Sequence, residues 1–305
     1  MDPDSRLQNS VFRPPFFTPP SAWPAPVGVI IPCFNAAETI CRAVDSVRRQ
    51  TWRPAELILV DDASDDETLD LLNRLRAGEG DPADRGWIRV LRFRVNRGPG
   101  AARNAGWDAA TQPLLAFLDA DDVWRPAKLM TQAAFMLENP RVALSGHRSG
   151  HFGREVGPRN PPGNARALRK TRSVSGSTRT PARRISAVRL LAHNLFPARS
   201  VMLRRSLPFR FAEDKRRSED YLLWLEIALS GRRIAFLDVE LAGAFKRDLG
   251  AGGLTIDPAR MAAAERDTYR RLWRKGRLGT LSAVPALAFS GLRYAVRRPR
   301  WALKR

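Results

Sequence analysis

Two acidic runs directly follow two apolar segments in the N-terminal half of this 305-residue chain. Asp61 and Asp62 follow one segment (ELILV), and Asp119 and Asp121 follow another (LLAFL). Carboxylate oxygens at a strand end can bind Mg²⁺ or Mn²⁺, or accept hydrogen bonds from a nucleotide base or ribose. The pattern favours metal-assisted binding of a nucleotide diphosphate. The simpler alternative is that each run is a solvated surface turn.

A third acidic pair, Glu219 and Asp220, begins an amphipathic segment further along the chain. Acidic residues at a helix start complement the helix dipole, which is the structural interpretation of this pair. The functional interpretation is a general base that takes the proton from an acceptor hydroxyl. The sequence spacing alone does not bring this pair to the first two runs.

Apolar runs and helical patterns alternate through the first half of the chain and predict the elements that would position these acids. We expect strands over residues 27–31, 56–60, 88–93 and 114–118, and helices over 36–50, 64–75 and 101–110. Ser64 and Glu67 have the spacing of a capping box. The alternation predicts an α/β fold with a mostly parallel, Rossmann-like sheet and helices on both faces. Ligands bind such sheets at the carboxyl ends of the strands, so Pro32 and both acidic runs should share one rim.

The pattern changes after residue 144. Residues 146–183 are rich in Gly, Pro, Ser and Arg and predict a mobile basic loop or insertion. A basic helical region begins at Pro258, and the segment 278–296 is apolar except for Arg293 and a few small or polar residues. Between these regions we expect helices over 185–193 and 219–229 and strands over 200–204 and 234–239.

The net charge of +21 comes from two regions rather than from the whole chain. Residues 146–190 carry eleven Lys or Arg against one acid, and residues 258–305 carry thirteen against two. Local basicity favours an anionic partner such as lipid headgroups. A nucleic-acid-binding protein is the alternative, but basic stripes interleaved with aromatic residues are absent from the sequence. We therefore expect no nucleic-acid partner.

Several other patterns exclude competing classes. The glycine-rich run 98–103 lacks the last glycine of a dinucleotide fingerprint and follows the third strand instead of the first, so NAD binding is rejected. Arg97, just before this run, and Arg103, at its end, are either cations near a diphosphate or surface charges. Two cysteines and three scattered histidines predict neither a disulfide framework nor a zinc site. No signal-peptide pattern and no run of 18 apolar residues is present in the sequence.

Six segments in this order closely resemble the family 2 glycosyltransferases. They are residues 29–35 (VIIPCFN), 50–52 (QTW), 56–66 (ELILVDDASDD), 96–106 (NRGPGAARNAG), 117–122 (FLDADD) and 218–225 (SEDYLLWL). The resemblance extends over about residues 27–257. It implies a GT-A fold, a Mn²⁺ or Mg²⁺ cofactor, and transfer of a sugar with inversion from a nucleotide diphosphate, commonly of uridine.

The resemblance also implies roles for individual residues. Asp220 matches the catalytic base, with Glu219 beside it, and Asp121 with Asp119 matches the metal–diphosphate site. Asp62 would contact the base or ribose. The whole set predicted to bind the donor nucleotide is Pro32, Phe34, Asn35, Glu38, Asp61, Asp62, Arg97, Arg103 and Asp119.

The chain departs from the family pattern after the predicted base helix. Many relatives carry a histidine in a loop there, whereas this chain has Lys246-Arg247-Asp248 before a glycine-rich run. Lys246 and Arg247 are candidates to stabilise the diphosphate leaving group. The basic stretch 146–183 is a second departure, on the acceptor side.

These patterns divide the chain into three parts. Residues 1–26 form a flexible Pro-rich leader, and 258–305 form a basic amphipathic helical tail. The part between, 27–257, is the GT-A domain, with a nucleotide-sugar-binding half (27–144) and an acceptor half (145–257).

A cell-envelope or lipid-linked glycan is the expected acceptor of this chain. We expect the protein on the inner face of the cytoplasmic membrane, attracted to anionic lipid, although the apolar segment 278–296 could instead pack on the core. A catalytically silent, nucleotide-binding relative is the remaining alternative.

Overall fold

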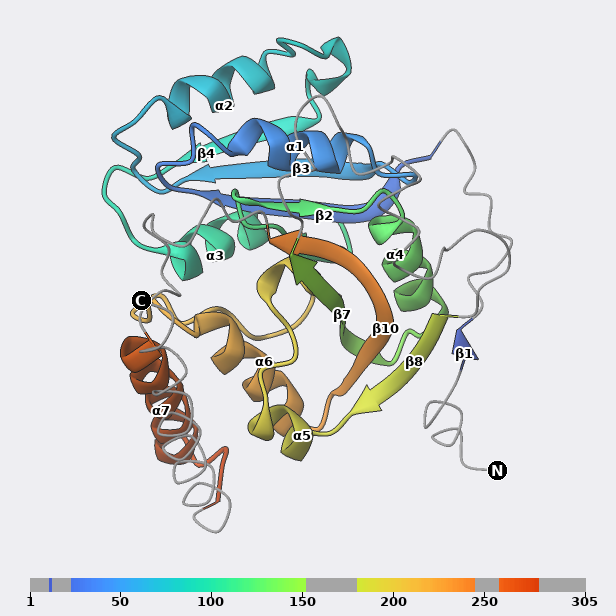
Figure 1. Ribbon diagram of the computed structural model, residues 1–305, viewed down its shortest axis with the longest axis vertical. Helices are drawn as coiled ribbons and strands as arrows, with labels where there is room; N and C mark the ends of the chain where they lie inside the picture. Colours follow the sequence, from blue (N-terminus) through green and yellow to red (C-terminus); the bar gives the residue numbers. More distant parts are fainter. Residues whose placement is uncertain (1–10, 13–22, 152–179, 245–257, 280–305) are drawn as a thin grey trace.

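The computed structural model describes residues 11–12, 23–151, 180–244 and 258–279 (Figure 1). Its strands form one sheet in the order β1-β8-β10-β7-β9-β5-β2-β3-β4, with β6 paired to β10. The α/β, GT-A-type fold class predicted from the sequence is confirmed. None of the described helices is long and apolar enough to cross a membrane.

The half of the sheet formed by the N-terminal part of the chain is parallel. β2 lies between β5 and β3, and β4 pairs with the outer side of β3. The elements of this half are β2 (Ala25–Cys33), α1 (Ile40–Arg48), β3 (Pro54–Asp61), α2 (Thr68–Arg76), η2 (Pro82–Asp84), β4 (Ile88–Arg92), α3 (Pro99–Ala109) and β5 (Leu114–Phe117). Each predicted strand and helix of this half is present, with bounds that differ by a few residues.

The other half of the sheet is mixed. β9 is antiparallel to both β5 and β7, and β10 is parallel to β7 but antiparallel to β6 and β8. Its elements are β1 (Val11–Phe12), β6 (Asp122–Trp124), α4 (Lys128–Glu138), β7 (Val142–His151), β8 (Thr180–Ile185), α5 (Ala187–Ala192), η4 (Ala198–Ser200), β9 (Met202–Arg204), α6 (Glu219–Leu229), β10 (Arg233–Ala244) and α7 (Pro258–Arg274). The sheet as a whole is therefore less parallel than strand–helix alternation predicts.

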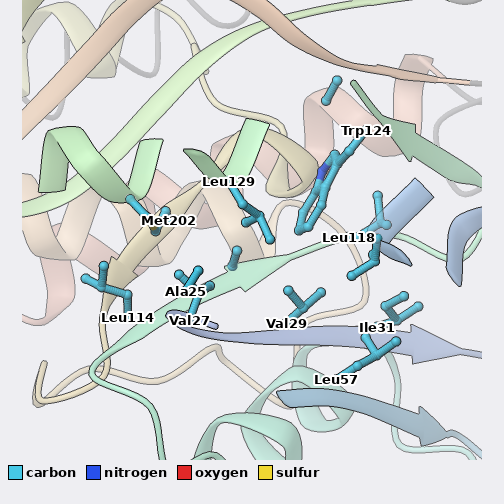
Figure 2. Packing of buried hydrophobic residues seen from close by; sticks show 14 of the residues in the cluster. Ala25, Val27, Val29, Ile31, Leu57, Leu114, Leu118, Trp124, Leu129 and Met202 are labelled. Atoms are coloured by element: carbon cyan, nitrogen blue, oxygen red, sulfur yellow. The ribbon is translucent and has the colours of Figure 1, made fainter. Parts of the chain in front are cut away.

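Alternate residues of β2 enter two different hydrophobic clusters, one on each face of the sheet. Val27, Val29 and Ile31 belong to the cluster that also holds Leu57 and Trp124, as Figure 2 shows. The other face packs against α3, where a Cβ on Gly106 would lie only 2.5 Å from the Cγ2 of Ile30. This close approach fixes α3, and with it the glycine-rich turn that precedes the helix, against the centre of the sheet.

Three local predictions need correction. The ends of the stretch 146–183 are strands, because residues 146–151 belong to β7 and 180–183 to β8, and only 152–179 lie outside the described residues. Within the leader, β1 pairs with β8. The capping box is wrong: Asp66 accepts the hydrogen bond from the Thr68 N–H, and the hydroxyl of Ser64 accepts one from the Asn35 N–H instead.

Candidate active site

The strand order places the two acidic runs on either side of the end of β2. Asp61 ends β3 and is the register partner of Cys33 at the end of β2. On the other side, the Leu118 N–H donates to the carbonyl of Ile30, so Asp119 follows one residue beyond the last contact of β5 with β2. The first two acidic runs therefore share the rim that the sequence predicts for them.

The loop after β2 is joined to the loop after β3 by side-chain hydrogen bonds. Asn35 adopts a left-handed backbone conformation (φ 49°), and its side-chain oxygen accepts from the Asp65 N–H at 3.1 Å. Asp66 accepts from the Ala37 N–H at 3.2 Å. Beside this junction Phe34 is 50% exposed and Glu38 is also exposed. The loops thus form one rigid edge that presents an aromatic ring to solvent, as a base-binding surface requires.

Asp62 is committed to the glycine-rich turn. Its two carboxylate oxygens accept hydrogen bonds from the backbone N–H groups of Arg97 and Gly98, both at 2.7 Å. Gly98 has a positive φ of 91°, a conformation that favours glycine. Asp62 therefore positions the start of α3, and the role in base or ribose binding stays a prediction. Asp61 is fully buried, and its Oδ2 has no hydrogen-bond partner in the described structure.

Arg103 joins the second acidic site, at Asp119, to the third, at Glu219. Its guanidinium donates to Asp119 at 2.6 Å and to Glu219 at 2.7 Å, and it is only 4% exposed. Burial opposes the charged form, yet the carboxylates of Asp119 and Glu219 hold the pKa of Arg103 above its ordinary value. The sequence favours Arg103 as a cation near a diphosphate or at the surface, whereas the structure buries it as a bridge between two acids. Its direct role is to position them.

Asp220 lies in the first turn of α6, beside this bridge. Burial, reinforced by the negative charge of Glu219, raises the pKa of Asp220 to about 7, although Arg103 acts in the opposite direction. A carboxylate with a pKa near the working pH is well suited to accept a proton. The arrangement therefore brings the third acidic site to the second, which sequence spacing alone does not do.

The segment before α6 is fixed to α3 and to the glycine-rich turn. The Asn104 side chain exchanges two 2.9 Å hydrogen bonds with the backbone of Phe211. Arg97 forms an ion pair with Glu213 at 2.5 Å, and Arg216 donates to the carbonyl of Asn96 at 3.1 Å. Arg97 is thus at the rim, but its partner in this structure is Glu213. Asn104 is not among the residues predicted from the sequence, although it lies one residue from Arg103 in the same motif.

The Asp119–Asp122 run offers hard oxygen ligands of the kind that Mg²⁺ and Mn²⁺ prefer. Asp121 is exposed, and the Asp119 side chain retains 29% of its exposure. Burial and the nearby charge of Asp119 raise the pKa of Asp122 to about 8, against the opposing effect of Arg199, whose Nη1 donates to Asp122 at 2.9 Å. This crowding of negative charge is what a divalent cation would relieve, so the residues fit such an ion.

The metal ligands available from the chain are nevertheless few. Among the residues that the structure describes, no group of three or more His, Cys, Asp or Glu side chains is arranged to hold a metal ion. An ion at Asp119 and Asp121 would need further ligands, and the oxygens of a diphosphate supply them. Lys246 and Arg247 lie outside the described residues. Ala244, the last described residue of β10, is paired with Asp122.

Comparison with known proteins shows the family of the chain. The family model described as glycosyl transferase family 2 matches residues 28–205, more than half of the chain. The chain belongs to glycosyl transferase family 2. The matched range includes both acidic runs and Arg103 but ends before Glu219 and Asp220. The base assignment therefore depends on the geometry around Arg103 rather than on the family match.

Two relatives illustrate the range of the family. This family 2 chain is 43% identical over 103 residues to an uncharacterised glycosyltransferase of Nostoc sp.. The aligned residues make up 34% of this chain but only 30% of that protein. It is 29% identical over 201 residues to the UDP-Glc:alpha-D-GlcNAc-diphosphoundecaprenol beta-1,3-glucosyltransferase WfgD of Escherichia coli, 66% of this chain and 69% of that protein.

Two solved structures share the fold of the family 2 chain. TarS residues 1–349 of S. aureus, in complex with UDP-GlcNAc, has a TM-score of 0.58 at 23% identity, covering 81% of this chain and 66% of that one. The mannosyltransferase PcManGT of Pyrobaculum calidifontis, in complex with GDP-Man and Mn²⁺, has a TM-score of 0.57 at 19% identity. The match covers 91% of this chain and 76% of PcManGT. At these identities the likeness demonstrates the fold alone.

The buried bridge of Arg103 should be essential for stability. In Arg103→Met, two carboxylates lose their buried counter-charge, and we expect the free energy of unfolding to fall by about 3–5 kcal/mol. Arg97→Met is the matched control, because the Arg97–Glu213 pair is about half exposed and should contribute at most about 1 kcal/mol. Urea unfolding measures both. Equal losses in the two variants would contradict a special role for the Arg103 bridge.

Proposed function

We propose that this chain is an inverting glycosyltransferase that moves a sugar from a uridine diphosphate sugar to a hydroxyl group of an acceptor. The observation that carries the proposal is the Arg103 bridge, which contacts Asp119 on the donor rim and Glu219 beside the proposed base. A relative that uses UDP-Glc and a structural neighbour that holds UDP-GlcNAc support the choice of donor.

A single displacement fits the groups available at the rim. Asp220 accepts the proton of the acceptor hydroxyl while the hydroxyl oxygen forms a bond to the anomeric carbon. The bond from that carbon to the diphosphate oxygen breaks, and its electron pair leaves with the diphosphate. Attack on the face opposite the leaving group inverts the anomeric centre, and the enzyme itself forms no covalent bond.

The donor is bound at the ends of β2, β3 and β5. Phe34 supplies an exposed ring for the base, next to Pro32 at the end of β2. Asn35, Glu38, Asp61 and Asp62 complete the proposed nucleotide side. Asp119 and Asp121 would hold Mn²⁺ or Mg²⁺, which, when bound, supplies positive charge at the departing diphosphate. Lys246 and Arg247 remain proposed as further cations for that diphosphate.

The acceptor proposed here is a lipid-linked or cell-envelope glycan. WfgD is named for an acceptor on diphosphoundecaprenol, and another relative is a succinoglycan biosynthesis protein of Rhizobium meliloti, ExoU, 38% identical over 109 residues. An acceptor attached to lipid favours a place at the inner face of the cytoplasmic membrane, where the anionic leaflet attracts a strongly basic chain.

A panel of nucleotide sugars, tested with and without Mn²⁺, decides the donor. We expect binding and slow hydrolysis of a uridine diphosphate sugar, both dependent on the metal. Binding without any hydrolysis or transfer would instead indicate a catalytically silent relative. Equal binding of unrelated nucleotides would contradict the proposed donor site.

The pH dependence of transfer should report Asp220. Only the deprotonated carboxylate accepts a proton, so kcat/KM should rise with pH through the raised pKa of about 7. Glu219→Gln removes one of the charges that raise the pKa of Asp220, so the ascending limb should move to lower pH. Glu226→Gln, which changes the far end of the same helix, should leave the limb in place. An unmoved limb in Glu219→Gln would contradict the assignment of Asp220.

A further inference from the structure

A strongly basic surface covers the end of the molecule where α5, α6 and α7 pack together. Figure 1 shows these helices gathered at the lower end, away from β3 and β4. Tyr221 and Tyr269 join them through hydrogen bonds to the carbonyl of Leu191, at 3.1 and 2.9 Å. The segments 183–193, 228–233 and 268–279 contain ten arginines and lysines. Two of these are paired with acids outside the segments, Arg271 with Asp214 and Asp267 and Lys275 with Glu226. We call the exposed surface formed by these three segments the basic face.

A hollow of about 470 Å³ lies in the basic face, between the start of α5 and the end of α6. Arg184, Arg189 and Arg232 line it, and all three are exposed. The acid closest to it in sequence, Glu226, is paired with Lys275 at 2.8 Å. The hollow therefore presents positive charge to an anionic group, and arginine is well suited to bind phosphate oxygens.

Two large apolar side chains of the basic face are exposed. Val188, beside Arg189, is 77% exposed, and Trp273, one helical turn after Arg270, is 46% exposed. A dissolved anion is bound by charge and hydrogen bonds, so exposed apolar side chains would contribute nothing to its binding. The headgroup region of a bilayer uses both, because arginines contact phosphates while apolar and tryptophan side chains enter the boundary with the acyl chains.

We propose that the basic face docks the protein on an anionic phospholipid bilayer. Arg184, Arg189 and Arg232 hold headgroup phosphates at the hollow, and Val188 and Trp273 enter the interface. This inference rests on the proposed peripheral membrane location and assigns it to a surface. Helix α6 joins that surface to the catalytic rim: from Asp220 to Ala228, which lines the hollow, the helix rises about 12 Å. A docked molecule would thus hold its base a short distance from the headgroups.

Vesicle flotation of the full chain tests this surface. Vesicles of phosphatidylethanolamine with phosphatidylglycerol are compared with vesicles of phosphatidylcholine alone. We expect binding to the anionic vesicles, weakened by salt. The triple variant R184Q/R189Q/R232Q should bind them about 100-fold more weakly, as expected for three arginines near an anionic surface. The matched triple R49Q/R76Q/R85Q removes three exposed charges elsewhere and should bind like the wild type.

The outcomes separate the surface from the function. Equal loss in the two triples, or no loss in either, overturns the basic face as the docking surface. Competition by inorganic phosphate at an equal phosphate concentration, or tighter binding of a short DNA duplex, overturns the bilayer as its partner. Absence of wild-type binding to the anionic vesicles overturns the membrane location itself. Thermal unfolding and binding of the uridine diphosphate sugar, expected unchanged in R184Q/R189Q/R232Q, show that any lost docking does not come from a damaged fold or catalytic rim.

Discussion

Replacing Asp220 with asparagine should lower kcat by a factor of about 10² to 10⁴, the usual contribution of a general base. Asparagine has nearly the same shape, and its side-chain oxygen can still accept the hydrogen bond from the Tyr221 N–H. What it cannot do is take a proton from the acceptor hydroxyl. Single-turnover transfer to a glycan acceptor measures the loss. Donor binding should be unchanged, because Asp220 contributes nothing to the nucleotide side of the rim.

The Glu219→Gln variant distinguishes the role of Glu219 from that of Asp220. Glu219 is buried and bound to Arg103, so it lacks the freedom to meet an acceptor. We expect the Glu219→Gln variant to retain most of the transfer rate above neutral pH. Its ascending limb of kcat/KM against pH should be shifted to lower pH, as described above. If Glu219→Gln lost as much activity as Asp220→Asn at every pH, the roles assigned to these two residues would be wrong.

The donor half of the site is predictable from sequence because its geometry follows from strand order. An apolar run that ends in acids fixes where those acids lie in a parallel sheet, as for Asp61 and Asp119, and neighbouring parallel strands place them at one rim. The local sequence pattern does not define which carboxylate oxygens already accept hydrogen bonds from the protein itself. Asp62 has the residue type of a ligand contact, yet both of its oxygens accept backbone N–H groups from residues 97 and 98.

The base side is not predictable in the same way, because its contacts span more than 100 residues. Arg103 and Glu219 are separated by 116 positions, and the bond between them is formed only when α6 packs on α3. The capping-box error has a related cause. Ser64 has the correct spacing to cap α2, but a backbone N–H from a neighbouring loop, that of Asn35, competes for its hydroxyl. Tertiary partners decide both cases.

Replacing Asp121 with alanine should remove the metal-dependent part of donor binding. We expect a loss of at least about 100-fold in Mn²⁺ affinity, since even loss of a ligand's hydrogen-bonding partner costs about 10- to 100-fold. Titration of the uridine diphosphate sugar with and without Mn²⁺ measures this effect. Asp70→Ala, which removes an exposed acid from α2, is the control. Metal-dependent binding that survives in Asp121→Ala would contradict the proposed ligand.

Asp119 differs from Asp121 in a way that gives this prediction a second readout. Both are proposed metal ligands, but Asp119 alone is bound to Arg103, and its charge is one of the causes that raise the pKa of Asp220. In the metal-free protein, Asp119→Asn should therefore lower the pKa of Asp220, as followed by carboxyl NMR, whereas the exposed Asp121 should have a smaller influence. Equal shifts in Asp119→Asn and Asp121→Asn would mean that Asp119 does not link the metal site to the base.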